Sequence, residues 1–169
     1  VGAGFVHALV LTSGGQALAW GDDSSGELGN GTDGASNYPV WVHAGEQNSS
    51  YPDSNLCNIV QVAAGRSGTH SLAIESGSGL CLAWGYNYYG QLGINTTASQ
   101  IRPVKVLGGD MRTTYLQNII SVSAGEFHSM ALASDGSVYT FGSNDNEDGS
   151  YGRLGINNIS DRYKTTPQK

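Results

Sequence analysis

The sequence predicts an all-β fold, and three observations support this prediction. An apolar run that ends on an aromatic residue and a glycine occurs three times, and each copy is followed by a polar loop that closes on Gly-x-Leu-Gly. Short apolar runs around each copy are separated by Gly, Asp, Ser and Asn, the residues typical of turns between strands. No stretch shows the 3.6-residue periodicity of a helix over a helical length. The 169-residue chain is therefore expected to repeat one small antiparallel unit.

Several landmarks keep the same order in every copy. The apolar runs are Gly15–Gly21, Gly79–Gly85 and Gly136–Gly142, and the loops close at Gly26–Gly29, Gly90–Gly93 and Gly152–Gly155. An Ala-Gly pair recurs about every 60 residues, and a histidine and a proline keep the same phase, at His7, His70 and His128 and at Pro39, Pro103 and Pro167. These landmarks divide the chain into repeats of about 1–57, 58–117 and 118–169.

Each repeat supplies four short apolar runs. In the middle copy we expect strands at 59–63, 70–74, 80–84 and 104–107, with a glycine-containing hairpin turn at 75–79. Four antiparallel strands per repeat are typical of a propeller blade. Alignment of the copies predicts that the chain begins inside a strand and that the third repeat is incomplete, stopping at the start of its last strand.

These motifs resemble the repeat of the regulator of chromosome condensation family, and the resemblance covers essentially the whole chain. Gln91-Leu92-Gly93 and Leu28-Gly29-Asn30-Gly31-Thr32 are close to the family pattern, whereas the third copy has Phe141 in place of Trp and a longer loop. The resemblance implies an all-β fold of about three four-stranded antiparallel blades of a normally seven-bladed β-propeller. Because a closed propeller needs about four to eight blades, we expect an open arc.

Composition and charge exclude several function classes. The net charge is −6, and residues 1–65 contain six acids and no Lys or Arg. Nucleic acid is therefore not an expected partner, because phosphate backbones are bound by clustered basic side chains. No apolar run is long enough to span a membrane. Catalytic motifs are missing as well, so we expect a protein that is not an enzyme and has no cofactor.

The three repeat histidines are expected to be structural rather than metal ligands, because equivalent positions in a propeller are spread around a ring. In the third loop, Asn144, Asn146, Asp148 and Gly149 fit the start of a calcium loop, but Gly155 stands where such a loop has a bidentate Glu. A solvated acidic loop is the default interpretation. The family includes a photoreceptor with clustered tryptophans, but Phe141 at a repeat position makes light sensing a remote alternative.

The two cysteines and the glycosylation sequons bear on location. Cys57 and Cys81 are predicted two strands apart, about 9.5 Å, beyond the roughly 7 Å reach of a disulfide unless Cys57 frays from its strand. Sequons occur at Asn30, Asn48, Asn95 and Asn158, although the family's Leu-Gly-Asn-Gly-Thr pattern generates such triplets by itself. The Ser-, Thr- and Asn-rich, Lys-poor composition favours an extracellular or cell-surface location.

Loops that follow the third run of each repeat carry the candidate binding residues. Tyr86, Tyr88 and Tyr89 stand in the middle loop, and Tyr is enriched where proteins bind one another. Equivalent loops with different chemistry on one rim suit a binding surface on a repeated scaffold. The alternative is that these tyrosines pack on the neighbouring blade. The other candidate residues on this rim are Asp22 and Asp23 in the first loop and Asp145, Asp148 and Tyr151 in the third.

The leading hypothesis is a non-catalytic protein-binding scaffold that uses rim loops 22–27, 86–91 and 143–152 and forms part of a longer extracellular protein. Family members include a nucleotide-exchange factor for a Ran-type GTPase and a secreted β-lactamase inhibitor. An exchange-factor role is disfavoured here, because no wedge hairpin and no basic arm are evident. The alternative is a structural module whose open blade edges pair with further copies of itself in a ring or filament.

Overall fold

The computed structural model describes residues 1–65, 69–109, 114–145, 152–158 and 160–169. Strands in this part of the chain form three sheets of four strands, and a short 3₁₀ helix, η1 (Gly45–Asn48), follows the first sheet. Blade 1 contains β1 (Gly2–Ala3), β2 (His7–Leu11), β3 (Ala17–Gly21) and β4 (Ser36–Trp41). Blade 2 contains β5 (Ile59–Ala64), β6 (His70–Glu75), β7 (Cys81–Gly85) and β8 (Gln100–Lys105). Blade 3 contains β9 (Ile119–Ala124), β10 (His128–Ala133), β11 (Val138–Ser143) and β12 (Tyr163–Gln168).

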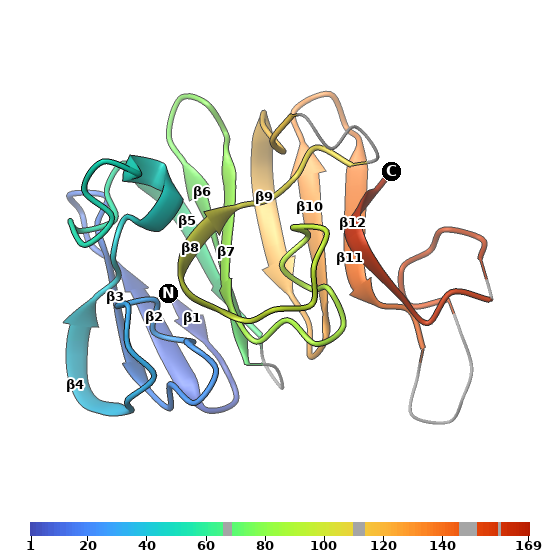
Figure 1. Cartoon of the computed structure of the whole chain (residues 1–169). Coiled ribbons are helices and arrows are strands. Elements are labelled where there is room, and N and C mark those ends of the chain that lie inside the picture. Colours follow the sequence, from blue (N-terminus) through green and yellow to red (C-terminus); the bar gives the residue numbers. More distant parts are fainter. Residues whose placement is uncertain (66–68, 110–113, 146–151, 159) are drawn as a thin grey trace.

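Each sheet is an antiparallel meander in which strands pair in chain order. Tight turns join the second and third strands, and Gly77 and Gly136 adopt positive φ angles of 79° and 85° there, the left-handed conformation that glycine tolerates best. Figure 1 shows the three sheets side by side, with blade 2 between the other two. The all-β class and the three four-stranded blades predicted from the sequence are confirmed.

The hydrophobic core lies between blades rather than within one. One cluster of buried side chains joins blades 1 and 2, around Leu9, Leu82 and Trp84, and a second joins blades 2 and 3, around Leu72 and Phe141. Blade 2 is therefore covered on both faces, and every residue of β7 is buried. The blades that end the arc have only one covered face, so burial alternates along β2 and β10.

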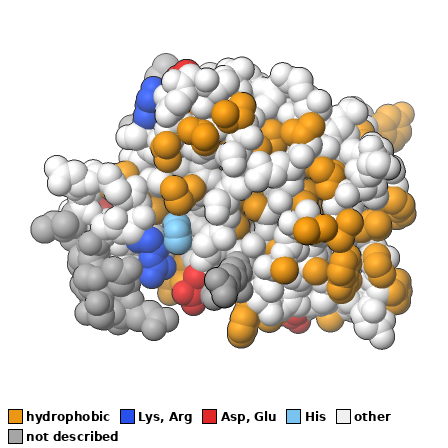
Figure 2. Space-filling view, turned by 180° about the vertical axis from the view of Figure 1, so that it is seen from behind, with side chains coloured by type: hydrophobic (Ala, Val, Ile, Leu, Met, Phe, Trp, Pro, Cys, Tyr) orange, Lys and Arg blue, Asp and Glu red, His pale blue; other side chains and the backbone are white. Residues whose placement is uncertain are grey.

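Blades 1 and 3 share neither core cluster, so the described blades form an open arc. Apolar side chains remain exposed at both ends. Figure 2 shows hydrophobic side chains gathered at the end of the arc that carries blade 1, where Tyr38 and Trp41 are exposed. At the other end, Met130, Leu132 and Val138 are 36–45% exposed.

The fourth strands differ from the sequence prediction. The strand expected at 104–107 is β8, which spans Gln100–Lys105, and the last strand of the third repeat is β12, which ends one residue before Lys169 rather than beginning there. The outermost strand of each blade pairs with one neighbour only and half faces solvent, so its residues need not be apolar. In the described part of the chain, no helix is long and apolar enough to cross a membrane.

Candidate functional site

The predicted rim loops leave their sheets at one common edge. The third strand of each blade ends at or next to a glycine, Gly21, Gly85 or Gly142, and a Cβ at these positions would lie 2.4–2.7 Å from a backbone carbonyl oxygen of the loop between the first and second strands. The next residue donates its backbone N–H to a carbonyl of that same loop, in the pairs Asp22 to Val6 (2.9 Å), Tyr86 to Thr69 (2.9 Å) and Ser143 to Phe127 (2.7 Å). Both kinds of loop therefore build one surface, which we call the loop face (Figure 1).

The second residue of each rim loop holds the loop together. Asn87 Nδ2 donates to the carbonyls of Thr96 and Ala98 at 2.9 and 3.0 Å, and its Oδ1 accepts from the Leu92 N–H at 2.9 Å. Asp23 stands at the equivalent position of blade 1, where its Oδ1 accepts from the Leu28 N–H at 2.8 Å. Asp23 was predicted to contact a partner, but its side chain is fully buried and bonded within its own loop. Its position makes it part of the scaffold.

Burial changes the acid–base behaviour of the first rim loop. Desolvation raises the pKa of Asp23 to about 6, and it also raises the pKa of Glu27. Glu27 Oε2 accepts from the Ser25 N–H at 2.8 Å, whereas its buried Oε1 has no hydrogen-bond partner. Blade 2 has the amides Asn87 and Gln91 at these two positions. Blade 1 therefore buries two carboxyl groups where blade 2 buries neutral groups.

The tyrosines of the second rim loop form an aromatic cluster with one residue of blade 3. The rings of Tyr86 and Tyr89 lie 6.2 and 5.0 Å from the ring of Phe127. Tyr88 lies 5.2 Å from Tyr89 in an edge-to-face contact and 6.4 Å from Tyr86. Tyr86, Tyr89 and Phe127 are half-buried, but Tyr88 is 64% exposed. The cluster thus joins two blades and presents Tyr88 to solvent.

Sequence reasoning missed Phe127. It directly precedes His128, at the position held by Val6 and Thr69 in the other copies. The repeat alignment therefore contained the signal, since a large aromatic residue stands where a β-branched residue is otherwise found. Its contact with the tyrosines follows from the loop geometry, which brings this residue against the start of the rim loops.

The acidic candidates of the loop face differ in their surroundings. Asp22 is half-buried, and its carboxylate accepts from Ser24 Oγ at 2.7 Å. Asp145 accepts from Ser143 Oγ at 2.7 Å and pairs with Arg162 at 3.2 Å, and these contacts hold its pKa below the usual value. Asp148 and Tyr151 lie outside the described residues. Of the two described acids, Asp22 has no basic partner among the residues that the structure describes.

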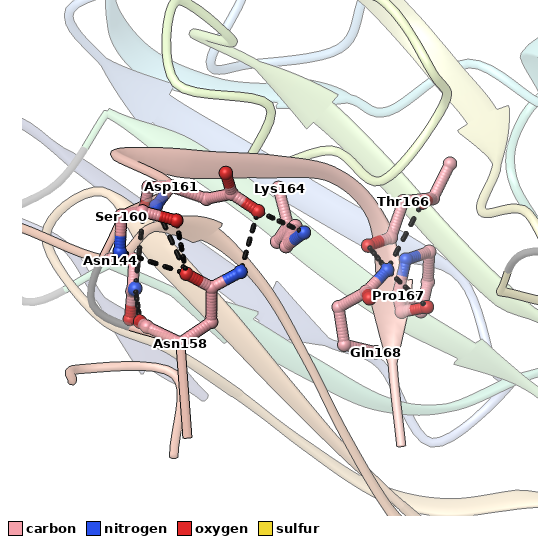
Figure 3. Close-up of polar contacts among 8 residues, drawn as sticks. All are labelled: Asn144, Asn158, Ser160, Asp161, Lys164, Thr166, Pro167 and Gln168. Carbon is pink, nitrogen blue, oxygen red and sulfur yellow. Dashed lines mark hydrogen bonds and ion pairs between the residues drawn. The ribbon is translucent and has the colours of Figure 1, made fainter. Parts of the chain in front are cut away.

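Hydrogen bonds fix the base of the third rim loop, as Figure 3 shows. Asn144 Nδ2 donates to the carbonyls of Asn158 and Asp161 at 2.7 and 3.0 Å, and its Oδ1 accepts from the Leu154 N–H at 3.2 Å. Asn158 Nδ2 donates to the Asp161 carboxylate at 2.7 Å, and Lys164 pairs with the same carboxylate at 2.6 Å. The Asn144 side chain, the first ligand of the alternative calcium loop, is thus buried and already bonded. The other three residues named for that loop, Asn146, Asp148 and Gly149, lie outside the described residues.

Two of the repeat histidines, His7 and His70, link neighbouring blades. His7 Nε2 lies 2.9 Å from Ser71 Oγ, which donates to the Glu27 carbonyl at 3.1 Å. Burial lowers the pKa of His7 to about 4 and that of His70 to about 3, so both imidazoles are neutral near pH 7. Among the described residues, no three His, Cys, Asp or Glu side chains lie together as a metal site would require.

The cysteines are both free thiols in the described structure. Cys57 is exposed and forms no disulfide with Cys81, which is fully buried between blades 2 and 3. Desolvation raises the pKa of Cys81 to about 12. A thiol with so high a pKa is a poor nucleophile at neutral pH.

Comparison with known proteins identifies the repeat. The model of the Regulator of chromosome condensation (RCC1) repeat matches residues 14–74 and 78–132, and a second model of this repeat matches residues 119–149. The human probable E3 ubiquitin-protein ligase HERC4 is 33% identical over 171 residues, which cover 100% of this chain and 14% of that protein. Human HERC3, also named a probable E3 ubiquitin-protein ligase, is 35% identical over 162 residues, which cover 95% of this chain and 13% of that protein.

Solved structures share the fold. Human WBSCR16 superposes with a TM-score of 0.69 and 24% identity over 98% of this chain and 37% of its own. Yeast RCC1 (Prp20), in its complex with Kap60, superposes with a TM-score of 0.66 and 22% identity over 99% of this chain and 36% of its own. These likenesses show the fold, and the family-model matches over most of the sequence show that the chain belongs to the regulator of chromosome condensation (RCC1) repeat family.

Proposed function

We propose that this chain is a non-catalytic protein-binding scaffold that recognises its partner through the loop face. The observation that carries the proposal is the aromatic cluster of Tyr86, Tyr88, Tyr89 and Phe127. Three of its rings support one another across two blades, and the fourth, Tyr88, is 64% exposed. A tyrosine held in this way offers a large contact area at little cost in conformational entropy.

The chemistry of the loop face suggests the kind of partner. Asp22 lies on this face, and the first 65 residues contain six acids and no Lys or Arg. In blade 3, Arg162 pairs with Asp145, whereas Asp22 in the first rim loop has no basic partner among the described residues. Electrostatic complementarity then favours a protein surface with an apolar patch for Tyr88 and Lys or Arg side chains facing the first rim loop.

Two further observations support a non-catalytic role. His7 and His70 are neutral and occupied by hydrogen bonds between blades, which leaves neither positioned as a general base. The relatives named as probable E3 ubiquitin-protein ligases act on proteins, and this chain spans only 14% and 13% of their length. We propose that the chain contributes recognition to a larger protein. An extracellular location stays a prediction, which a mass shift on enzymatic removal of N-linked glycans would test.

A photo-crosslinking amino acid at position 88 tests the proposed contact in the natural host cell. The control is the same amino acid at Tyr51, which is 71% exposed and donates its backbone N–H to the Asn48 carbonyl at the end of η1. Figure 1 shows this short helix at the end of the sheets opposite the loop face. We expect position 88 to crosslink to one defined protein that position 51 does not reach. Crosslinks that are equal at both positions would contradict a specific loop face.

Affinity measurements with the crosslinked protein, once purified, complete the test. We expect Tyr88→Ala to weaken binding at least tenfold, because exposed Tyr residues at interface centres are frequent hot spots. Tyr51→Ala should leave the affinity unchanged. Because Tyr88 is the exposed member of the cluster, its replacement should also leave the unfolding temperature within a few degrees of the original. An unchanged affinity in Tyr88→Ala would remove the cluster as the binding site.

A further inference from the structure

The four rings of the aromatic cluster form a closed circuit on the loop face. Tyr86 contacts the rings of Tyr88 and Phe127. Tyr89 contacts the same two rings, and the four centroid distances are 5.0–6.4 Å. Within this described cluster, the rings that stand opposite each other in the circuit are not in contact. The cluster therefore spreads its rings over an area of the surface instead of gathering them into one stack.

The cluster also carries hydroxyl groups that its own chain does not use. The phenol oxygens of Tyr86, Tyr88 and Tyr89 form no hydrogen bond with a described residue. Desolvation raises the pKa of Tyr86, and the phenols of Tyr89 and Tyr88 raise it further because they lie near it. A partner that reaches the cluster thus meets aromatic faces and three neighbouring hydroxyl groups, each of which accepts as well as donates hydrogen bonds.

An unpaired acid stands beside the cluster. Glu126 directly precedes Phe127 and is half-buried. Its carboxylate forms no hydrogen bond or ion pair with a described residue, in contrast to Asp145, which pairs with Arg162. The loop face also carries Asp22, and the net charge of the chain is −6. Like-charge repulsion therefore disfavours an anionic group of a partner at the cluster.

The described Lys and Arg side chains leave the rings of the cluster uncovered. Four of these side chains pair with acids elsewhere, namely Arg102, Arg162, Lys164 and Lys169. The cation–π contact found in the described part of the chain places Lys105 Nζ 5.2 Å from the centroid of the Tyr115 ring, which does not belong to the cluster. The ring faces of the cluster are thus available to a cation from another molecule.

The chemistry of the rings and of the acid together selects the group that fits. A partner that settles on the cluster removes water from its edge, and a carboxylate such as Glu126 that loses water without gaining a cation costs free energy. An apolar side chain fits the rings but leaves the acid unpaired. An ammonium group supplies charge but is strongly hydrated. The guanidinium of arginine is planar and weakly hydrated, stacks on aromatic faces and donates N–H groups to carboxylate and hydroxyl oxygens.

We propose that the aromatic cluster receives an arginine side chain of the partner protein, with the guanidinium over Tyr88 and its charge balanced by Glu126. This inference rests on the proposed function, since it names the group that the loop face recognises. A guanidinium meets both requirements set out above for the partner, because its flat faces make apolar contact with a ring while it carries positive charge.

Two short peptides test the proposal before the partner is known. The probe is acetyl-Gly-Arg-Gly-amide, and the matched control is acetyl-Gly-citrulline-Gly-amide, in which citrulline keeps the shape of arginine but has no charge. Each peptide is titrated into the full chain, and nuclear magnetic resonance follows the ring signals of Tyr88 and Phe127. The ring of Tyr51, which is 71% exposed and lies away from the loop face, reports non-specific contact.

We expect the arginine peptide to bind with a dissociation constant about tenfold lower than that of the citrulline peptide, because only the guanidinium is attracted by the rings and by the acid. Tyr88→Leu keeps an apolar side chain but removes the aromatic face, and Glu126→Gln keeps the shape but removes the charge. Each variant should lower the preference for arginine by a factor of about three or more. Tyr51→Leu is the control and should leave this preference unchanged.

Equal affinity for the two peptides would overturn the proposal, and so would an arginine peptide that shifts the Tyr51 signals as strongly as those of Tyr88. A preference for arginine that survives in Tyr88→Leu would place the guanidinium elsewhere and would overturn it as well. The crosslinking experiment separates this inference from the proposed function. One defined crosslink at position 88 combined with equal peptide affinities would overturn the inference alone, whereas equal crosslinks at positions 88 and 51 would overturn the function on which it rests.

Discussion

His70 Nε2 lies 2.9 Å from Ser129 Oγ, although 59 residues separate the two in the chain. Both groups are buried, and the hydroxyl donates a hydrogen bond to the Gln91 carbonyl at 2.7 Å. The polar link crosses a core that is otherwise apolar and fixes how blade 3 is aligned on blade 2. The histidine of one blade thus contacts the serine that follows the histidine position of the next blade.

Removal of this hydroxyl should therefore destabilise the protein. In Ser129→Ala, the His70 N–H loses its acceptor in a buried site, and we expect a loss of about 2–3 kcal/mol in the free energy of unfolding. Chemical denaturation measures it. Ser134→Ala, at an exposed turn position of the same blade, is the control and should change the stability by no more than about 0.5 kcal/mol. Equal effects in both variants would contradict a structural link.

The buried histidines should make the fold sensitive to acid. Burial lowers the pKa of His7 to about 4 and that of His70 to about 3, whereas an unfolded histidine titrates near 6.5. The unfolded chain therefore binds more protons below pH 6.5, so stability that is present above this pH is lost as the pH falls toward 3 to 4.

Denaturation at a series of pH values between 7 and 4 measures this dependence. Replacement of His70 by Asn removes one of the histidine titrations, so we expect the variant to be less stable at pH 7 but to lose less stability on acidification. A variant whose stability falls as steeply with pH as that of the original protein would show that His70 does not contribute.

The carboxyl group of Asp23 should act in the opposite direction. Its pKa is raised from 3.8 to about 6 by desolvation, so its protonated form is favoured in the folded state. Between pH 3.8 and 6, Asp23 is ionised in the unfolded chain but still largely protonated in the folded protein, so the stability of the folded protein falls as the pH rises. We expect Asp23→Asn to stabilise the protein by about 1–2 kcal/mol at pH 7 and to have little effect near pH 4.

Asn87 supports this expectation, because it holds the equivalent position of blade 2 with three hydrogen bonds. Thermal unfolding at both pH values is the measurement. Asp22→Asn, one residue away and half-buried, is the matched control and should give no comparable difference between the two pH values. A stabilisation by Asp23→Asn that is as large at pH 4 as at pH 7 would point to a cause other than the buried charge.

The repeat made the fold predictable, but it did not reveal which copies of a loop residue are exposed. The strands at 59–63 and 70–74 were placed from apolar runs and turn glycines, because both strands lie in the core. The fourth strand was misplaced because Gln100–Lys105 is an outer strand with a polar sequence. Asp23 was predicted to contact a partner because it stands in a rim loop, and only its three-dimensional position shows that it is buried where blade 2 has Asn87.

The tyrosine cluster illustrates the same limit. The sequence placed Tyr86, Tyr88 and Tyr89 in one loop and left packing and binding as alternatives. The structure divides these roles, since Tyr86 and Tyr89 pack on Phe127 and Tyr88 is exposed. This division depends on Phe127, 38 residues farther along the chain than Tyr89, and no local pattern around the tyrosines encodes that contact.

A pair of glycines offers a test of how blades pack. Gly29 and Gly155 close equivalent loops and have nearly equal φ angles of 66° and 68°, so an alanine suffers the same backbone strain at either position. At Gly29 the added Cβ would also lie 2.7 Å from Trp84 Nε1, whereas at Gly155 no described atom lies within 4 Å. We expect both variants to lose about 1 kcal/mol from backbone strain and Gly29→Ala to lose a further ~1–3 kcal/mol from overpacking.

Chemical denaturation of the two variants gives this difference directly, because the strain common to both cancels. Tryptophan fluorescence provides a second readout, since Gly29→Ala should shift the emission of buried Trp84 and Gly155→Ala should not. Equal losses of stability would mean that the Gly29 loop moves aside without cost. In that case the closing glycine would serve the turn of its own loop, and the aromatic residue of the next blade would not require a glycine beneath it.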